Sequence, residues 1–158
     1  MNTKLRFLLY LDALLMYQYG IKLRSLNISE DKLKIEFSKS TGRMRYIYHD
    51  RDLIFTLRAN DGFLVPTIKG AKLLLSILEP PKLRVYVQED VADYIAKGRT
   101  LFCKHVIDAD LNIRPGSEVL VVDKYENLVA VGRAILSGRE MIYCKVGKCV
   151  KIRKGVNE

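Results

Sequence analysis

Residues 97–155 decide the fold of the second half of this chain. They contain four separated segments, which read Lys97-Gly98-Arg99-Thr100-Leu101-Phe102, Arg114-Pro115-Gly116-Ser117-Glu118-Val119-Leu120-Val121-Val122-Asp123, Leu128-Val129-Ala130-Val131-Gly132-Arg133-Ala134 and Val150-Lys151-Ile152-Arg153-Lys154-Gly155. The apolar runs are short, and turn-forming residues such as Pro115-Gly116 separate them. Short strands at this spacing predict a small β-barrel. Gly98 is expected to end a helix in the left-handed conformation.

The chain before these segments predicts one further strand and a short helix. Residues 83–87 alternate between polar and apolar side chains as a strand does. The helical pattern after them places Val91, Tyr94 and Ile95 on a buried face. Pro80-Pro81 cannot continue a helix, so we expect a domain boundary there. The predicted domains are residues 1–81 and 82–158.

The first of these domains is predicted to be α+β. Apolar residues at helical spacing over residues 5–16 predict an opening helix, which is expected to stop at Gly20. Alternating residues predict strands over 33–37, 44–48 and 53–57, followed by a helix from about Thr67. The expected architecture is therefore an antiparallel sheet of about three strands with helices. With the barrel, the whole chain is expected to be α+β.

Charge and composition narrow the function classes. The chain of 158 residues is 49% hydrophobic, which argues against general disorder, and its formal net charge is +9. The basic excess is spread over both halves, as in folded proteins that bind polyanions. Three cysteines form no disulfide framework, and the apolar stretch near the N-terminus is too short for a membrane span. We expect no membrane association and a cytoplasmic location.

The order of the four C-terminal segments resembles a PUA domain, the small β-barrel of RNA-modifying enzymes and ribosome-linked proteins. This resemblance implies RNA binding through the first helix, the glycine turn after it, the following strand and the last strand. It implies, residue by residue, the following RNA-binding positions: Lys97, Gly98, Arg99, Phe102, Lys104, His105, Lys148, Lys151, Arg153 and Lys154.

The chemistry of these residue types suits RNA. Lys and Arg neutralise phosphate, and Arg can do so with two parallel hydrogen bonds. Phe102 or His105 could stack on an unpaired base, although Phe102 also reads as a core aromatic because it follows Leu101. Lys151 and Arg153 are expected on one side of a strand. Reversing both charges is expected to lower RNA affinity and to flatten its salt dependence.

The first domain carries a second resemblance. Three segments precede the PUA-like half in a fixed order: Leu14-Leu15-Met16-Tyr17-Gln18-Tyr19-Gly20, Ser40-Thr41-Gly42-Arg43-Met44-Arg45 and Leu57-Arg58-Ala59-Asn60-Asp61-Gly62-Phe63. Together with the PUA-like half, they resemble the C-terminal extension of the archaeal tRNA-guanine transglycosylase, which inserts the precursor of archaeosine into tRNA. This resemblance implies tRNA binding and an accessory role beside a separate catalytic transglycosylase chain. Arg43 and Arg45 are candidates for additional phosphate contacts.

Catalytic and metal patterns are weak in this sequence. The family's catalytic barrel has no counterpart in a chain of this length, so no catalytic residue is assigned and the chain is expected to be non-catalytic. Cys103 and His105 would share one face of a strand, but no Cys-x-x-Cys pair accompanies them, so no metal is expected. Cys144 and Cys149 are expected to pack as small apolar residues. No cofactor is predicted.

Two other functions stay open at this stage. A ribosome-linked factor, in ribosome biogenesis or translation initiation, can also combine a small α+β domain with a PUA domain. A scaffold for protein partners is the third alternative, with the exposed side of the helix over residues 5–16 as its docking surface.

Overall fold

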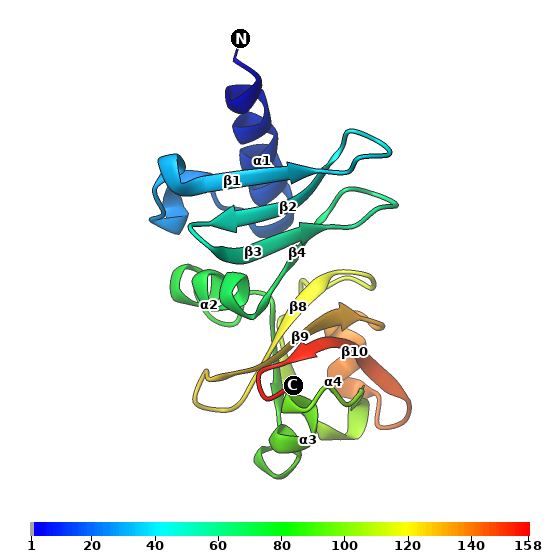
Figure 1. Cartoon of the computed structure of the whole chain (residues 1–158). Coiled ribbons are helices and arrows are strands. Elements are labelled where there is room, and N and C mark those ends of the chain that lie inside the picture. The colour runs from blue at the N-terminus through cyan, green and yellow to red at the C-terminus, as the bar shows by residue number, and fades with distance from the viewer. Residues whose placement is uncertain (1) are drawn as a thin grey trace. The chain divides into compact units, whose positions relative to one another are not determined.

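The computed structural model describes residues 2–158 and divides the chain into two compact units (Figure 1). The first unit extends to Ile77, and the second comprises Leu78–Glu158. The first contains the elements α1 (Thr3–Tyr19), η1 (Leu23–Leu26), η2 (Glu30–Lys32), β1 (Leu33–Phe37), β2 (Met44–His49), β3 (Asp52–Leu57), β4 (Leu64–Pro66) and α2 (Ile68–Ile77).

Helix α1 ends at Gly20 as predicted and begins at Thr3, two residues before the predicted stretch. The side chain of Asn2 accepts a hydrogen bond from the backbone N–H of Lys4, which caps the first turn. Gly20 ends the helix at φ 70°, in the left-handed region that glycine adopts without a steric penalty. Tyr19 is buried and stacks on Phe55, with ring centroids 6.5 Å apart, so the end of the helix packs on the sheet.

The sheet of the first unit has four antiparallel strands in the order β1-β2-β3-β4. The expectation of about three strands therefore missed β4, which has three residues and ends at Pro66. A strand this short lacks the alternation that marks a strand in a sequence. Gln18 secures it, because its amide donates to the Leu64 carbonyl at 3.0 Å and accepts from the Leu64 N–H at 2.7 Å.

The second unit is a nearly closed, six-stranded barrel. Its elements are β5 (Arg84–Val87), η3 (Glu89–Val91), α3 (Ala92–Ala96), β6 (Leu101–Phe102), η4 (Cys103–His105), β7 (Val106–Ala109), β8 (Glu118–Val122), β9 (Leu128–Ala134), α4 (Gly138–Tyr143) and β10 (Lys148–Gly155). The strand order is β6-β10-β9-β8-β5-β7, and β5 pairs with β8 in parallel while the other pairs are antiparallel. The α+β class and the barrel predicted from the sequence are confirmed.

Two close backbone approaches tie the barrel to its first helix. A Cβ atom on Gly155 would lie 2.0 Å from the carbonyl oxygen of Ala96, so only glycine fits where β10 meets the end of α3. The N–H of Asn157 then donates to the same Ala96 carbonyl at 2.9 Å. These contacts fix the turn after α3 beside the last strand.

One detail of this helix differs from its expected pattern. Ile95 is buried, but Tyr94 is 63% exposed, so its predicted place on the buried face is wrong. The physical reason is the length of the element: a 3-10 turn precedes α3, which itself has five residues. A helix of little more than one turn can bury a narrow stripe at most.

Candidate nucleic-acid interface

The glycine turn after α3 presents two predicted cations to solvent. Lys97 caps the helix, and Gly98 follows at φ 90°, with its N–H donating to the Ile95 carbonyl at 2.9 Å. The side chains of Lys97 and Arg99 are both exposed on either side of this turn. The left-handed residue therefore reverses the chain between two positive charges. The Glu158 carboxylate lies against the backbone of Gly98, with Oε2 2.7 Å from where a Cβ would be, so the exposed cations and not this backbone are available to a phosphate.

The strand after this turn brings an aromatic ring beside a lysine. In the pairing of β6 with β10, Phe102 lies opposite Lys148, and Leu101 lies opposite Val150. Leu101 is fully buried, whereas Phe102 is 41% exposed. Phe102 is therefore not a core residue, and an exposed ring next to an ammonium group can stack on a base whose phosphate the lysine contacts.

Lys104 and His105 lie in a single 3-10 turn, η4, and not in a continuous strand. Lys104 is exposed, but His105 is half-buried and its Nδ1 lies 3.2 Å from Oε1 of Gln88. This turn also overturns the placement of Cys103 and His105 on one strand face. The hydrogen bond to Gln88 orients the imidazole, so part of its capacity for RNA contact is already used.

Strand β10 carries the remaining predicted cations. Lys151 is exposed and lies opposite Arg133 on β9, and Arg133 in turn lies opposite Glu118 on β8. Lys151 and Arg133 line a shallow hollow of about 360 Å³ together with Pro115, Gly116, Ala134 and Ile135. Arg133 did not figure among the predicted contacts. Arg133 is the single charged residue in the otherwise apolar run 128–134, and this is the signal that could have revealed it.

Arg153 has a structural partner that the sequence did not reveal. Its Nε forms an ion pair with Oε1 of Glu118, whose side chain is 2% exposed. A bulge between Ile152 and Lys154 interrupts the register of β10, and Lys154 is exposed beyond it. Arg153 therefore neutralises a buried carboxylate, and a change at this position alters the barrel as well as the surface charge.

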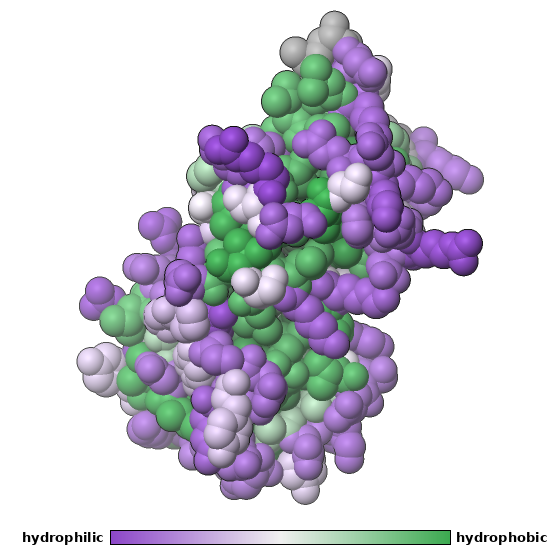
Figure 2. All heavy atoms as spheres, turned by 90° about the vertical axis from the view of Figure 1, so that its left-hand side faces the viewer, coloured by the Kyte–Doolittle hydropathy of each residue, from purple (hydrophilic) through white to green (hydrophobic). Residues whose placement is uncertain are grey.

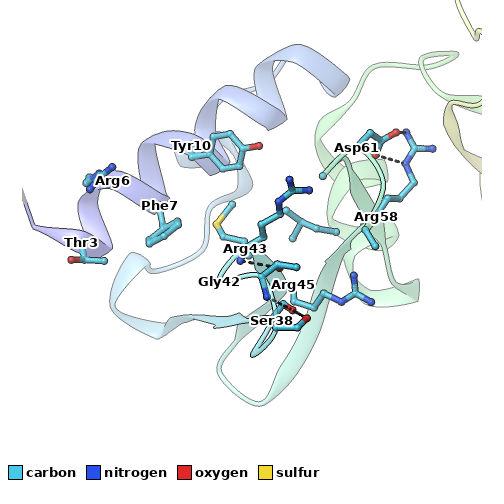
Figure 3. A pocket seen from close by; sticks show the side chains of 16 residues that line it. Thr3, Arg6, Phe7, Tyr10, Ser38, Gly42, Arg43, Arg45, Arg58 and Asp61 are labelled. Atoms are coloured by element: carbon cyan, nitrogen blue, oxygen red, sulfur yellow. Dashed lines mark hydrogen bonds and ion pairs between the residues drawn. The ribbon is translucent and has the colours of Figure 1, made fainter.

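The other two candidate contacts, Arg43 and Arg45, lie in the first unit. Arg43 is exposed in the turn between β1 and β2, and Arg45 is half-buried at the start of β2. Both line an open cavity of about 1040 Å³ (Figure 3).

Two buried thiols, one from η4 and one from β10, lie in the hydrophobic core of the barrel. Cys103 and Cys149 are both fully buried, and burial together with the neighbouring Cys103 thiol raises the pKa of Cys149. A raised thiol pKa disfavours the reactive thiolate. Among residues 2–158, no three His, Cys, Asp or Glu side chains group as a metal site, and no helix there is long and apolar enough to cross a membrane.

Comparison with known proteins assigns both units. Residues 10–81 match the patch-forming domain C2 of tRNA-guanine transglycosylase, and residues 83–156 match the PUA domain. The tRNA-guanine(15) transglycosylase of Methanococcus maripaludis is 41% identical over 145 residues, covering 92% of this chain and 22% of the relative. That of Pyrococcus abyssi is 39% identical over 148 residues, covering 94% of this chain and 25% of the relative.

Solved structures agree on the fold. A hypothetical protein from Pyrococcus horikoshii has a TM-score of 0.76 and 26% identity, covering 99% of this chain and 93% of that chain. A conserved PUA domain protein from Thermoplasma acidophilum has a TM-score of 0.64 and 24% identity, covering 90% of this chain and 85% of that chain.

The fold and its exposed basic strand thus define a PUA-domain protein. More specifically, the chain is a C2-type domain followed by a PUA domain, and it resembles the C-terminal part of archaeal tRNA-guanine(15) transglycosylase. It spans about a quarter or less of the length of these curated relatives, and the part it matches is their non-catalytic C-terminal region.

Proposed function

We propose that this chain binds RNA through its PUA domain and that its ligand is tRNA. The observation that carries the proposal is the pairing of β6 with β10, which places the exposed ring of Phe102 opposite Lys148. The contacts of Gly155 and Asn157 with Ala96 hold the glycine turn to the same last strand. Stacking and phosphate neutralisation are the two interactions that RNA-binding surfaces combine.

The surface favours contact with a backbone over the reading of a base sequence. Lys97, Arg99, Lys104 and Lys151 are exposed cations, and cations of this kind contact phosphates independently of sequence. Specificity for tRNA then comes from the shape of the folded RNA and from the base stacked on Phe102. The name of the curated relatives, tRNA-guanine(15) transglycosylase, supports tRNA as the ligand.

We further propose that the chain acts in archaeosine-type tRNA modification as an accessory beside a separate catalytic transglycosylase chain. Helix α1 supports this proposal as the candidate docking surface, because Leu5, Leu9 and Met16 are 48%, 52% and 43% exposed. Figure 2 shows apolar surface over this helix in the upper part of the view. Apolar side chains that project together from one helix are characteristic of a protein contact.

Binding of the purified chain to a tRNA transcript tests the first proposal. We expect an affinity that falls steeply with salt and that excess duplex DNA of equal charge does not displace. Preference for ribosomal subunits over tRNA would replace the proposal with a ribosome-linked function. Equal displacement by duplex DNA would reduce the interaction to nonspecific charge attraction.

Substitutions on α1 test the partner separately. L5E combined with L9E is expected to abolish co-purification with a tRNA-guanine transglycosylase chain while leaving tRNA affinity unchanged. The matched control is K4E, which changes an exposed polar residue of the same helix. Retained co-purification in the folded double variant would remove α1 as the docking surface.

A further inference from the structure

The first unit contains an arginine-lined cavity that the PUA surface does not explain. It is about 1040 Å³ in volume and lies between α1 and the two turns that join β1 to β2 and β3 to β4. Four arginines line it: Arg6 from the helix, Arg43 and Arg45 from the first turn and strand β2, and Arg58 from the second turn. Figure 3 shows Arg43 extending into the space between Tyr10 and Asp61.

The two turns have the same backbone geometry, which fixes the walls of the cavity. In the first, the N–H of Ser38 donates to the Arg43 carbonyl at 2.8 Å, and the N–H of Gly42 donates to the Ser38 carbonyl at 2.9 Å. In the turn between β3 and β4, the N–H of Arg58 donates to the Phe63 carbonyl at 2.9 Å, and the N–H of Gly62 donates to the Arg58 carbonyl at 2.8 Å. Both glycines have positive φ, 73° and 75°. Both turns extend from the same end of the sheet (Figure 1).

The charges of the two turns differ. Arg58 is neutralised by Asp61, with Nε and Nη2 each 3.0 Å from a carboxylate oxygen. No ion pair within residues 2–158 involves Arg6, Arg43 or Arg45. Asp61 is the single acid among the described lining residues. Three guanidinium groups therefore border one cavity without a carboxylate to balance them, which is the electrostatic requirement of an anion site.

The opposite wall supplies aromatic and apolar surface. Thr3, Arg6, Phe7 and Tyr10 follow one another at helical spacing on one face of α1, and all four line the cavity. Phe7 packs on Phe37 with ring centroids 4.6 Å apart, which anchors this face. Tyr10 is 49% exposed, and its hydroxyl lies 3.6 Å from where a Cβ on Gly62 would be. The phenol ring thus reaches from the helix to the second turn.

We propose that this cavity binds one unstacked nucleotide of a single-stranded RNA segment, with its phosphate on Arg43 and Arg45 and its base on the ring of Tyr10. A phosphate alone would fill a small part of 1040 Å³, and a duplex has no base face available for stacking. An anion site beside an exposed aromatic ring matches a nucleotide better than an acidic peptide, because the Asp and Glu side chains of such a peptide carry no planar ring to stack. The inference deepens the proposed RNA-binding function by adding a second contact in the other domain.

Titration of the whole chain with nucleoside monophosphates, followed by amide chemical shifts, tests the site without any tRNA. We expect shifts confined to the cavity and saturation at millimolar concentration or below. Inorganic phosphate and the unphosphorylated nucleoside are each expected to bind at least tenfold more weakly. Equal binding of ribose 5-phosphate and the nucleotide would overturn the proposal, because no base would then be recognised.

Two variants and a matched control assign the contacts. R43A combined with R45A is expected to weaken nucleotide binding at least tenfold, and Y10L to remove the preference for the nucleotide over ribose 5-phosphate. R51A combined with K72A removes the same two charges from exposed positions of the first unit outside the cavity and is expected to have no effect. Identical losses in both double variants would contradict the proposal.

One further variant distinguishes nucleotide binding at the cavity from RNA binding at the PUA surface. K148E combined with K151E changes the last strand of the barrel and is expected to leave mononucleotide binding at the cavity intact. If the unaltered chain fails to bind tRNA but still binds mononucleotides, the proposed tRNA function is wrong and the cavity proposal stands. If mononucleotides fail while tRNA binds through the PUA surface, the cavity proposal alone is wrong.

Discussion

The two basic regions of this molecule are built in different ways. On the PUA domain, the cations follow a turn and the last strand, and one of them, Arg153, neutralises the buried Glu118. In the first unit, the cations surround a cavity, and Arg43 and Arg45 take part in no ion pair within residues 2–158. An open row of charges suits a phosphate backbone, whereas a charged cavity with an aromatic wall suits a single nucleotide. The difference also predicts that the PUA surface is more strongly coupled to folding.

Glycine substitutions should show this coupling most strongly. G155A places a Cβ 2.0 Å from the Ala96 carbonyl, so we expect the barrel to lose about 3 kcal/mol in its free energy of unfolding. G42A, in the first-unit turn, meets no atom of residues 2–158 within 4 Å and is expected to cost about 1 kcal/mol, from its positive φ alone. Urea denaturation measures both. Equal losses would mean that the close approach at Gly155 does not constrain the fold.

Charge reversal on β10 should lower RNA affinity without unfolding the barrel. K148E combined with K151E places two acids where exposed lysines stand, and we expect the affinity for tRNA to fall by at least tenfold, or about 1.4 kcal/mol. The slope of log affinity against log salt should flatten by about two units.

The control for this variant is R51E combined with K72E, which reverses the same number of charges on exposed positions of the first unit. If the control lowers affinity as much as the β10 variant, net charge governs binding and the PUA surface is misplaced.

A comparison of substitutions at Arg153 and Arg43 distinguishes an arginine that stabilises the fold from one that is proposed to bind a ligand. R153M removes the ion pair between Arg153 and the buried Glu118 carboxylate, so we expect a loss of about 1–2 kcal/mol in the free energy of unfolding. R43M should leave stability unchanged, because the guanidinium of Arg43 forms no ion pair within residues 2–158. Thermal or urea unfolding of the two variants gives the comparison. An unchanged stability in R153M would show that the ion pair contributes nothing to the barrel.

The smallest expected effect is on the pH dependence of the free energy of unfolding, through Tyr86 on β5. Burial, with a hydrogen bond to Glu126, raises the pKa of Tyr86 to about 12 from its ordinary value of 10. The protonated phenol therefore stabilises the folded state below pH 10, and this contribution is lost as the pH rises from 10 to 12. The stability difference between wild type and Y86F should shrink over that interval. A difference independent of pH would contradict the assignment.

The sequence predicted the helices and strands of this protein better than the side-chain contacts between them. The order of segments from residue 97 onward identified the barrel because turn residues and short apolar runs are local signals. The ion pair between Arg153 and Glu118 joins residues on two strands separated by a third, and no local pattern records it. Tyr94 and β4 were misjudged for a related reason: a five-residue helix and a three-residue strand are too short to show a period.

The candidate site was predicted in part for the same reason. Glycine and lysine positions near residue 98 and on the last strand could be taken from the PUA resemblance. The exposure of Phe102, the hydrogen bond of His105 to Gln88 and the place of Arg133 beside Lys151 required the strand register. The cavity of the first unit depends on three segments that meet only after folding, so its arginines appeared in the sequence as two candidates and not as a site.

Ultraviolet crosslinking of the purified chain to tRNA, with the crosslinked residues identified by mass spectrometry, tests the central claim most directly. We predict crosslinks at Phe102 in the PUA domain and at Tyr10 in the first unit, both lost when excess unlabelled tRNA competes. Crosslinks confined to residues outside the two basic regions, or equal crosslinking to duplex DNA, would contradict the account.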